Sequence, residues 1–146
     1  MSIFNGTPDK IIGNRHDPML LRWNLIRVWK LPRVYLHKFL RSDDDRAPHD
    51  HPWWFISILL RGTYIEHING EINVRTAPAI CFRSTKDRHR VELLYHAVPV
   101  DDYTPYADIK WQALPTWSII ITGPVVRRWG FWCDDRFFPS REFEGC

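Results

Sequence analysis

The stretch HDHPWWFISILLRG, residues 49–62, decides how this chain folds. It opens with His49 and His51, which are separated by one residue, and continues as an apolar run that ends at Gly62. Side chains two residues apart on a β-strand point to the same face of the sheet. We therefore expect a strand over residues 51–60 and a glycine turn after it, with both imidazoles on the inward face at its start. Further along, the same face carries Trp53, Phe55 and Ser57.

The segments around this stretch carry the same kind of signal. Residues 33–41 alternate, which places His37 on one face together with Tyr35 and Phe39. Asn69-Gly70 is a two-residue hairpin signal, because both residues tolerate positive φ. About eight to ten short strands with turn signals between them, and almost no helical period, predict an all-β antiparallel sandwich or barrel.

The 146 residues are the length of a single domain. Residues 1–20 show little periodicity and are interpreted as a loop or arm, and RWNLIRVW (residues 22–29) fits a short helix or a strand. We assign residues 1–32 to an N-terminal arm packed on the domain and residues 33–146 to the barrel. An irregular insertion is expected around residues 95–115, because Asp, Pro and Tyr are frequent there.

Composition narrows the function classes. The net charge is only +3, from 20 basic and 17 acidic residues, with no clustered basic stripe, so nucleic acid is not an expected partner. The longest apolar run, residues 53–60, is too short to span a membrane. The first residues lack the basic and apolar regions of a signal peptide, so we expect a cytoplasmic protein.

Three widely spaced cysteines, an odd number, argue against a disulfide framework. Cys81 and Cys133 are interpreted as small buried apolar residues, and Cys146 is the last residue of the chain. This pattern agrees with a reducing compartment.

A third histidine, His89, begins a strand-like segment and completes the candidate metal site with His49 and His51. Three neutral imidazoles around a divalent ion leave open positions for water, dioxygen or substrate. Imidazole ligands suit Fe(II), Ni, Mn, Cu and Zn alike. The alternative is a set of pocket histidines that bind no metal.

The segment from His49-Asp50-His51 to Gly62 resembles the first motif of the cupin superfamily, the small jelly-roll β-barrels. The second cupin motif would fall on residues 84–89, where only His89 is kept. The resemblance covers roughly residues 33–133 and implies a single-domain cupin-like barrel with His49, His51 and His89 as metal ligands.

The glutamate that cupins usually carry in the first motif would fall near Phe55 or Ile56, and no carboxylate stands there. Without an anionic ligand the ion keeps more positive charge and one more open position, which favours anionic, chelating substrates. Three-histidine iron centres resemble those of thiol dioxygenases, so the resemblance implies Fe(II) first among the metals.

Other pocket candidates flank the three histidines. His37 fits an acid/base, an extra ligand or a hydrogen-bonded core histidine, and Tyr64 fits a residue that orients a substrate or moves a proton. Glu66 shares the face of Tyr64 but lies near a hairpin tip, which favours a solvated role. Arg90, with Arg83 and Arg88 nearby, fits a carboxylate-binding guanidinium or a charged, exposed strand edge.

These observations leave two hypotheses open. The first is a metal-dependent oxygenase acting on a small anionic substrate, with His37, Tyr64 and Arg90 as catalytic candidates. The second is a non-enzymatic module that binds a small ligand or another protein, which the degenerate second motif favours. The resemblance also implies that two copies of the barrel pair as a homodimer through an edge sheet.

Overall fold

The computed structural model describes residues 6–26, 32–43, 47–100 and 109–146. Within those ranges the chain forms strands and no helix, so the prediction of an all-β fold is confirmed. None of the described segments is a helix long and apolar enough to cross a membrane. The strands are β1 (Lys10–Asn14), β2 (Asp17–Ile26), β3 (Arg33–Phe39), β4 (Phe55–Arg61), β5 (Thr63–Ile68), β6 (Glu71–Thr76), β7 (Ala79–Arg83), β8 (His89–Leu93), β9 (Tyr95–Pro99), β10 (Ile109–Ala113), β11 (Thr116–Thr122), β12 (Gly130–Cys133) and β13 (Arg136–Pro139).

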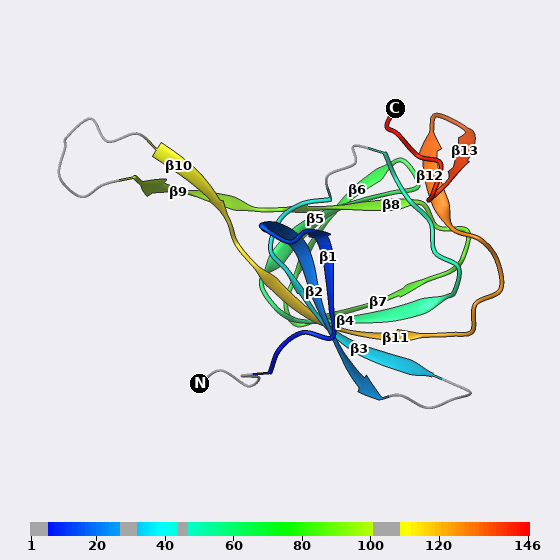
Figure 1. The fold of residues 1–146 in the computed structure, drawn as a ribbon, viewed down its shortest axis with the longest axis horizontal. Coiled ribbons are helices and arrows are strands. Elements are labelled where there is room, and N and C mark those ends of the chain that lie inside the picture. Colours follow the sequence, from blue (N-terminus) through cyan, green and yellow to red (C-terminus); the bar gives the residue numbers. More distant parts are fainter. Residues whose placement is uncertain (1–5, 27–31, 44–46, 101–108) are drawn as a thin grey trace.

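Two antiparallel sheets make the barrel (Figure 1). The larger has six strands in the order β1-β2-β3-β11-β4-β7, and the smaller has three in the order β6-β5-β8. Buried and less buried residues alternate along β4 and β11, which run side by side in the larger sheet. This period of two shows that one face of the sheet is turned inward, as the sequence predicts.

Two predicted turns pass the chain between strands. Gly62, between β4 and β5, has a φ of 95°, and a Cβ added there would lie 2.8 Å from the side chain of Thr116. Both features require glycine. Asn69 and Gly70 also have positive φ, and they join β5 to β6 in the expected hairpin.

The interpretation of residues 1–20 as a loop is wrong from Lys10 onwards, whereas residues 6–9 do lie outside the strands. β1 and β2 are strands that extend the larger sheet beyond β3, with β1 on β2 and β2 on β3. The described part of RWNLIRVW lies in β2 and is therefore strand; residues 27–29 lie outside the described residues. The ring of Trp23 stacks on that of Trp117 on β11 at 5.7 Å, a contact with a distant segment that favours the strand.

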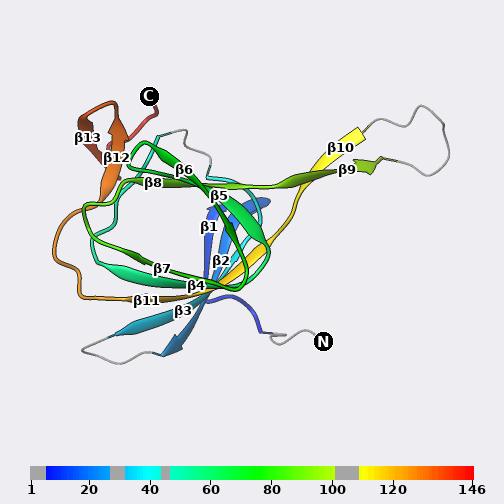
Figure 2. The ribbon, with the colours of Figure 1, turned by 180° about the vertical axis from the view of Figure 1, so that it is seen from behind.

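Two other expected elements differ in extent. The strand predicted over residues 51–60 begins only at Phe55, and the two histidines precede it outside any strand, with His49 in isolated bridges. The described part of the insertion around residues 95–115 is a regular two-stranded ribbon of β9 and β10, which projects from the barrel in both views (Figures 1 and 2). Residues 101–108 lie outside the described residues.

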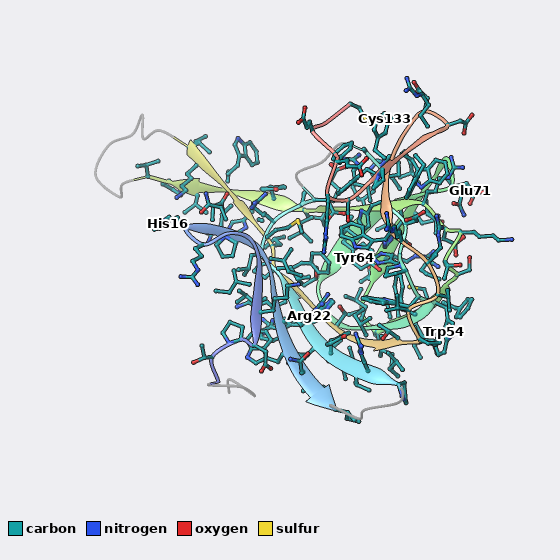
Figure 3. The ribbon with its side chains drawn as sticks, turned by 45° about the vertical axis from the view of Figure 1, so that its right-hand side comes forward. His16, Arg22, Trp54, Tyr64, Glu71 and Cys133 are labelled. Carbon is teal, nitrogen blue, oxygen red and sulfur yellow. A yellow bond between two sulfur atoms is a disulfide. The ribbon has the colours of Figure 1, made fainter. Side chains whose placement is uncertain are left out.

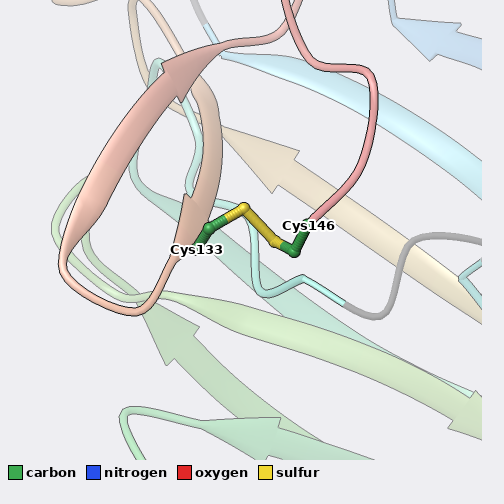
Figure 4. The surroundings of a disulfide bond; sticks show 2 residues. All are labelled: Cys133 and Cys146. Atoms are coloured by element: carbon green, nitrogen blue, oxygen red, sulfur yellow. A yellow bond between two sulfur atoms is a disulfide. The ribbon is translucent and has the colours of Figure 1, made fainter.

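The expectation of unpaired cysteines is wrong for two of the three. Cys133, at the end of β12, forms a disulfide with Cys146, with their Cα atoms 5.6 Å apart (Figure 4). Cys81 is free. The two partners are 13 residues apart, and the β12–β13 hairpin between them turns the chain back on itself. An odd count in the sequence could not show which pair would meet.

Candidate metal centre

The three predicted ligands meet inside the barrel. The ligand nitrogens of His49, His51 and His89 all lie within 4.8 Å of one another, and Nε2 of His51 is 2.8 Å from Nε2 of His89. Nitrogens that bind one ion tetrahedrally at about 2.1 Å lie about 3.4 Å apart. Ring movements on the order of 1 Å therefore bring all three within reach of one divalent ion, and the donor set fits such an ion.

Backbone hydrogen bonds hold two of the ligands against each other. The N–H of His49 donates to the carbonyl of His89 at 2.9 Å, and the N–H of His89 donates back at 2.9 Å. His49 also forms an isolated bridge with Phe131. The segment before β4 is thereby fixed between β8 and β12, which explains how ligands 40 positions apart in the chain reach one point.

Asp50, between the two histidines, ties the same segment to the C-terminal part of the chain. Its side chain is buried and accepts hydrogen bonds from the backbone N–H of Gly130 at 3.0 Å and from the indole N–H of Trp132 at 3.1 Å. The guanidinium of Arg127 forms an ion pair with it at 2.9 Å. Alternation thus directs the histidines to the cavity and the aspartate away from it.

Glu66 is the main correction to the predicted site. Its side chain is buried, not solvated, and Oε1 accepts a hydrogen bond from Nδ1 of His89 at 3.0 Å. Arg83 donates to both carboxylate oxygens, and Arg75 donates at 3.3 Å. This bond assigns the proton of His89 to Nδ1 and leaves Nε2, which faces Nε2 of His51, as the ligand atom.

The electrostatics of these groups suit metal binding. Burial lowers the pKa of His49 to about 4, partly offset by Asp43. Burial, followed by the other imidazoles, lowers the pKa of His51 well below its usual value. Burial raises the pKa of Glu66, but the hydrogen bonds from His89 and Arg83 outweigh it and hold that pKa at about 2. His49 and His51 are therefore neutral at pH 7, which is the form that binds a metal.

The histidines open onto a cavity of about 390 Å³ inside the barrel. Arg22 of β2 and Tyr64 of β5 come from opposite sheets, and both line it (Figure 3). Much of the remaining wall is aromatic or aliphatic. As predicted, the face that carries His49 and His51 continues along this wall; the continuation is Trp53, Phe55 and Ser57.

The structure brings two of the three catalytic candidates into the cavity. His37 lines it, is buried, and accepts a hydrogen bond from Arg22. Tyr64 lines it too, and burial raises the pKa of its phenol, which stays protonated at neutral pH. Arg90 lies on the other face of β8 from His89, with Nη2 3.6 Å from Glu92, so a role in holding substrate inside the cavity does not fit its position.

The sequence did not single out Arg22 as a functional candidate. It did place Glu66 on the strand face of Tyr64, but it favoured a solvated role for this carboxylate. Arg22 lies in a segment whose sequence fits a helix or a strand. The side to which its side chain projects is decided only by the pairing of β2 with β3. Arg83, expected at an exposed edge, is buried against Glu66 instead.

Comparison with known structures identifies the fold of this chain. No protein-family profile matches the sequence, and no curated protein resembles it in sequence. A double-stranded β-helix protein from Klebsiella pneumoniae subsp. pneumoniae is similar in structure, with a TM-score of 0.52 and 13% identity, over 90% of this chain and 97% of that one. The chain has the double-stranded β-helix fold of the cupins.

Two further structures support this cupin-like fold. KdgF from Halomonas sp. matches with a TM-score of 0.50 and 13% identity, over 72% of this chain and 81% of that one. A putative ethanolamine utilization protein Q from Salmonella typhimurium matches with a TM-score of 0.50 and 11% identity, over 73% and 70%. Among the described residues of this cupin-like barrel, the cluster that could hold a metal consists of three histidines and no carboxylate.

Proposed function

We propose that this protein is a metal-binding cupin in which His49, His51 and His89 hold a divalent ion, Fe(II) in the first place, and that it acts as an oxygenase on a small anionic substrate. The observation that carries the proposal is the convergence of three imidazoles on one point of the cavity inside the barrel. When bound, such an ion supplies a Lewis acid and, as Fe(II), a redox centre for dioxygen chemistry.

The chain's own residues supply binding and protection. Glu66 holds His89 in the tautomer that presents Nε2. The aromatic wall, with Phe55 and Trp53, excludes water from the cavity. The protonated phenol of Tyr64 is the proton donor that faces the cavity.

Metal analysis tests the proposal. Protein reconstituted without oxygen in Fe(II), Ni(II), Mn(II) or Zn(II) is expected to retain about one ion per chain, and the double variant His49→Ala/His51→Ala is expected to retain none. Negligible metal in the wild type after all four reconstitutions would contradict it. Oxygen uptake by the Fe(II) form with small thiols and small acids then tests the oxygenase step.

A specific observation keeps a non-enzymatic binding module as the second candidate. The β9–β10 ribbon projects from the barrel and exposes large apolar side chains, Ile109 at 63% and Trp111 at 66%. Exposed apolar surface of this kind marks a contact with another molecule. Retained metal without oxygen uptake on any candidate substrate would favour this function.

A further inference from the structure

Polar residues cross the cavity wall on the larger sheet in a single row. We call them the polar row: Lys10 of β1, Arg22 of β2, His37 of β3 and Ser118 of β11. Each member is in register with the next across the four neighbouring strands. Residues in register on antiparallel strands project from the same face, and all four line the cavity. The row runs from an exposed lysine to a buried serine.

Arg22 is the cation inside this row. It is half-buried; its Nε donates a hydrogen bond to Nε2 of His37 at 2.9 Å, and its guanidinium lies 4.5 Å from the centre of the Tyr35 ring. Neither neighbour carries a carboxylate. A partly buried guanidinium is normally paired with a carboxylate, and no acidic residue in the described parts of the chain forms an ion pair with Arg22.

Among the residues that the structure describes, two acidic ones line the cavity, and both are engaged elsewhere. Asp43 accepts a hydrogen bond from the N–H of Val91 at 2.7 Å and faces His49. Glu66 is bonded to His89 and Arg83. Both therefore belong to the side of the cavity where the three histidines lie, and the polar row is positively charged.

His37 gives the guanidinium its orientation. Burial lowers the pKa of His37 to about 3, so its ring is neutral at pH 7 and accepts the bond from Arg22 at Nε2. With Nε engaged by His37, the two terminal amino groups of Arg22 are the donors left for a ligand. A guanidinium presents such a pair in a planar fork that matches one carboxylate.

We propose that Arg22 is the anion-binding residue of this cavity and that it takes the carboxylate of a small ligand whose other end reaches the three histidines. Lys10 at the rim adds a second positive charge that draws anions inward, and Ser118 adds a hydroxyl beyond His37. This inference deepens the proposed function and rests on it only in treating the bound carboxylate as substrate.

Metal-free protein provides the test, with benzoate and its uncharged analogue benzamide as probes. Both fit a cavity with aromatic walls and differ in charge, and binding is followed by tryptophan fluorescence, since Trp53 and Trp129 line the cavity. Wild type is expected to bind benzoate at least about tenfold more tightly than benzamide. Arg22→Met is expected to abolish this preference, and Arg22→Lys to retain only part of it because the fork is lost.

Arg88→Met is the matched control, because it removes the same charge outside the cavity, from a side chain that lies over Trp132. It is expected to keep the full benzoate preference. Near-ultraviolet circular dichroism shows whether each variant is folded. If Arg22→Met is not folded, the benzoate preference of Arg22→Lys is the deciding measurement. An unchanged preference in a folded Arg22 variant, or none in wild type, overturns the inference. If inorganic phosphate displaces benzoate as effectively as acetate does, the inference that the ligand is a carboxylate is overturned.

The metal site and the anion site can fail separately. Arg22→Met is expected to retain the wild-type metal content, and His49→Ala/His51→Ala is expected to retain the benzoate preference. A wild-type protein that binds no metal but prefers benzoate would refute the proposed function alone. A wild-type protein that binds metal but shows no benzoate preference would refute the role of Arg22 alone.

Discussion

The cavity has two unlike sides. On one lie His49, His51 and His89 with Glu66 behind them, a group we call the histidine pole; on the other lies the polar row. The pole is held by paired backbone bonds and by a buried carboxylate with several donors. In the row, Arg22 has one hydrogen bond and a ring contact. A saturated site suits a permanent ion, whereas an unsaturated cation suits a ligand that comes and goes.

The largest effect is expected from the pole itself. His51→Ala removes one of the three proposed ligands, and the variant is expected to fall from about one ion per chain to none after desalting. Elemental analysis of the reconstituted protein measures this. The control is His67→Ala, whose imidazole is bonded to Glu92 outside the cavity. Equal metal loss in the control would mean that the ion binds elsewhere.

The disulfide braces the C-terminal segment on the side of the pole. Phe143, inside the loop that it closes, stacks on Phe131, which forms a bridge with His49. Cys146→Ser is expected to lower the free energy of unfolding by about 3 kcal/mol, because a loop of this length gains freedom in the unfolded chain. Urea unfolding measures this, with Cys81→Ser as the free-cysteine control. If a reductant does not lower the free energy of unfolding of the wild type, the disulfide does not stabilise the fold.

Glu66 is expected to act by positioning His89 and not as a metal ligand itself. Glu66→Gln keeps the shape of the side chain but removes the charge, and we expect metal affinity to fall by about 10- to 100-fold. Competition with a Zn(II) chelator measures the affinity. Glu92→Gln is the matched control, because Glu92 also bonds a histidine, His67, but outside the cavity. If both variants bind Zn(II) with the same affinity, Glu66 does not position His89 for metal binding.

Acid is expected to weaken both sides of the cavity in the metal-free protein. The pKa values of His37 and His49 are lowered to about 3 and about 4, so the unfolded chain binds more protons than the folded one below pH 6.5. Stability is therefore complete above that pH and falls as the pH drops from 6.5 towards 4. The slope is up to about 1.4 kcal/mol per pH unit for each histidine.

Urea unfolding at several pH values measures this slope, and His37→Gln is expected to reduce it while leaving the part due to His49. A stability that stays constant between pH 6.5 and 4 would show that neither imidazole is held neutral by burial.

The histidine pole was largely predictable from local pattern. His49 and His51 share a face because strand side chains alternate, and Gly62 marks the turn because its backbone needs positive φ. The strand boundary was misplaced because the bonds of His49 to His89 and of Asp50 to Gly130 hold the histidines in a segment before β4. Those partners lie about 40 and 80 residues away, beyond the reach of a local pattern.

The amino-acid sequence by itself determined the all-β fold and the inward histidines, since both depend on neighbouring residues and a period of two. Only the tertiary structure decided that Glu66 supports His89, that Arg22 faces the same cavity from β2, and that Cys133 joins Cys146. The physical reason is that the partner of a buried charge depends on strand order and register, and these are set by contacts between segments far apart in the chain.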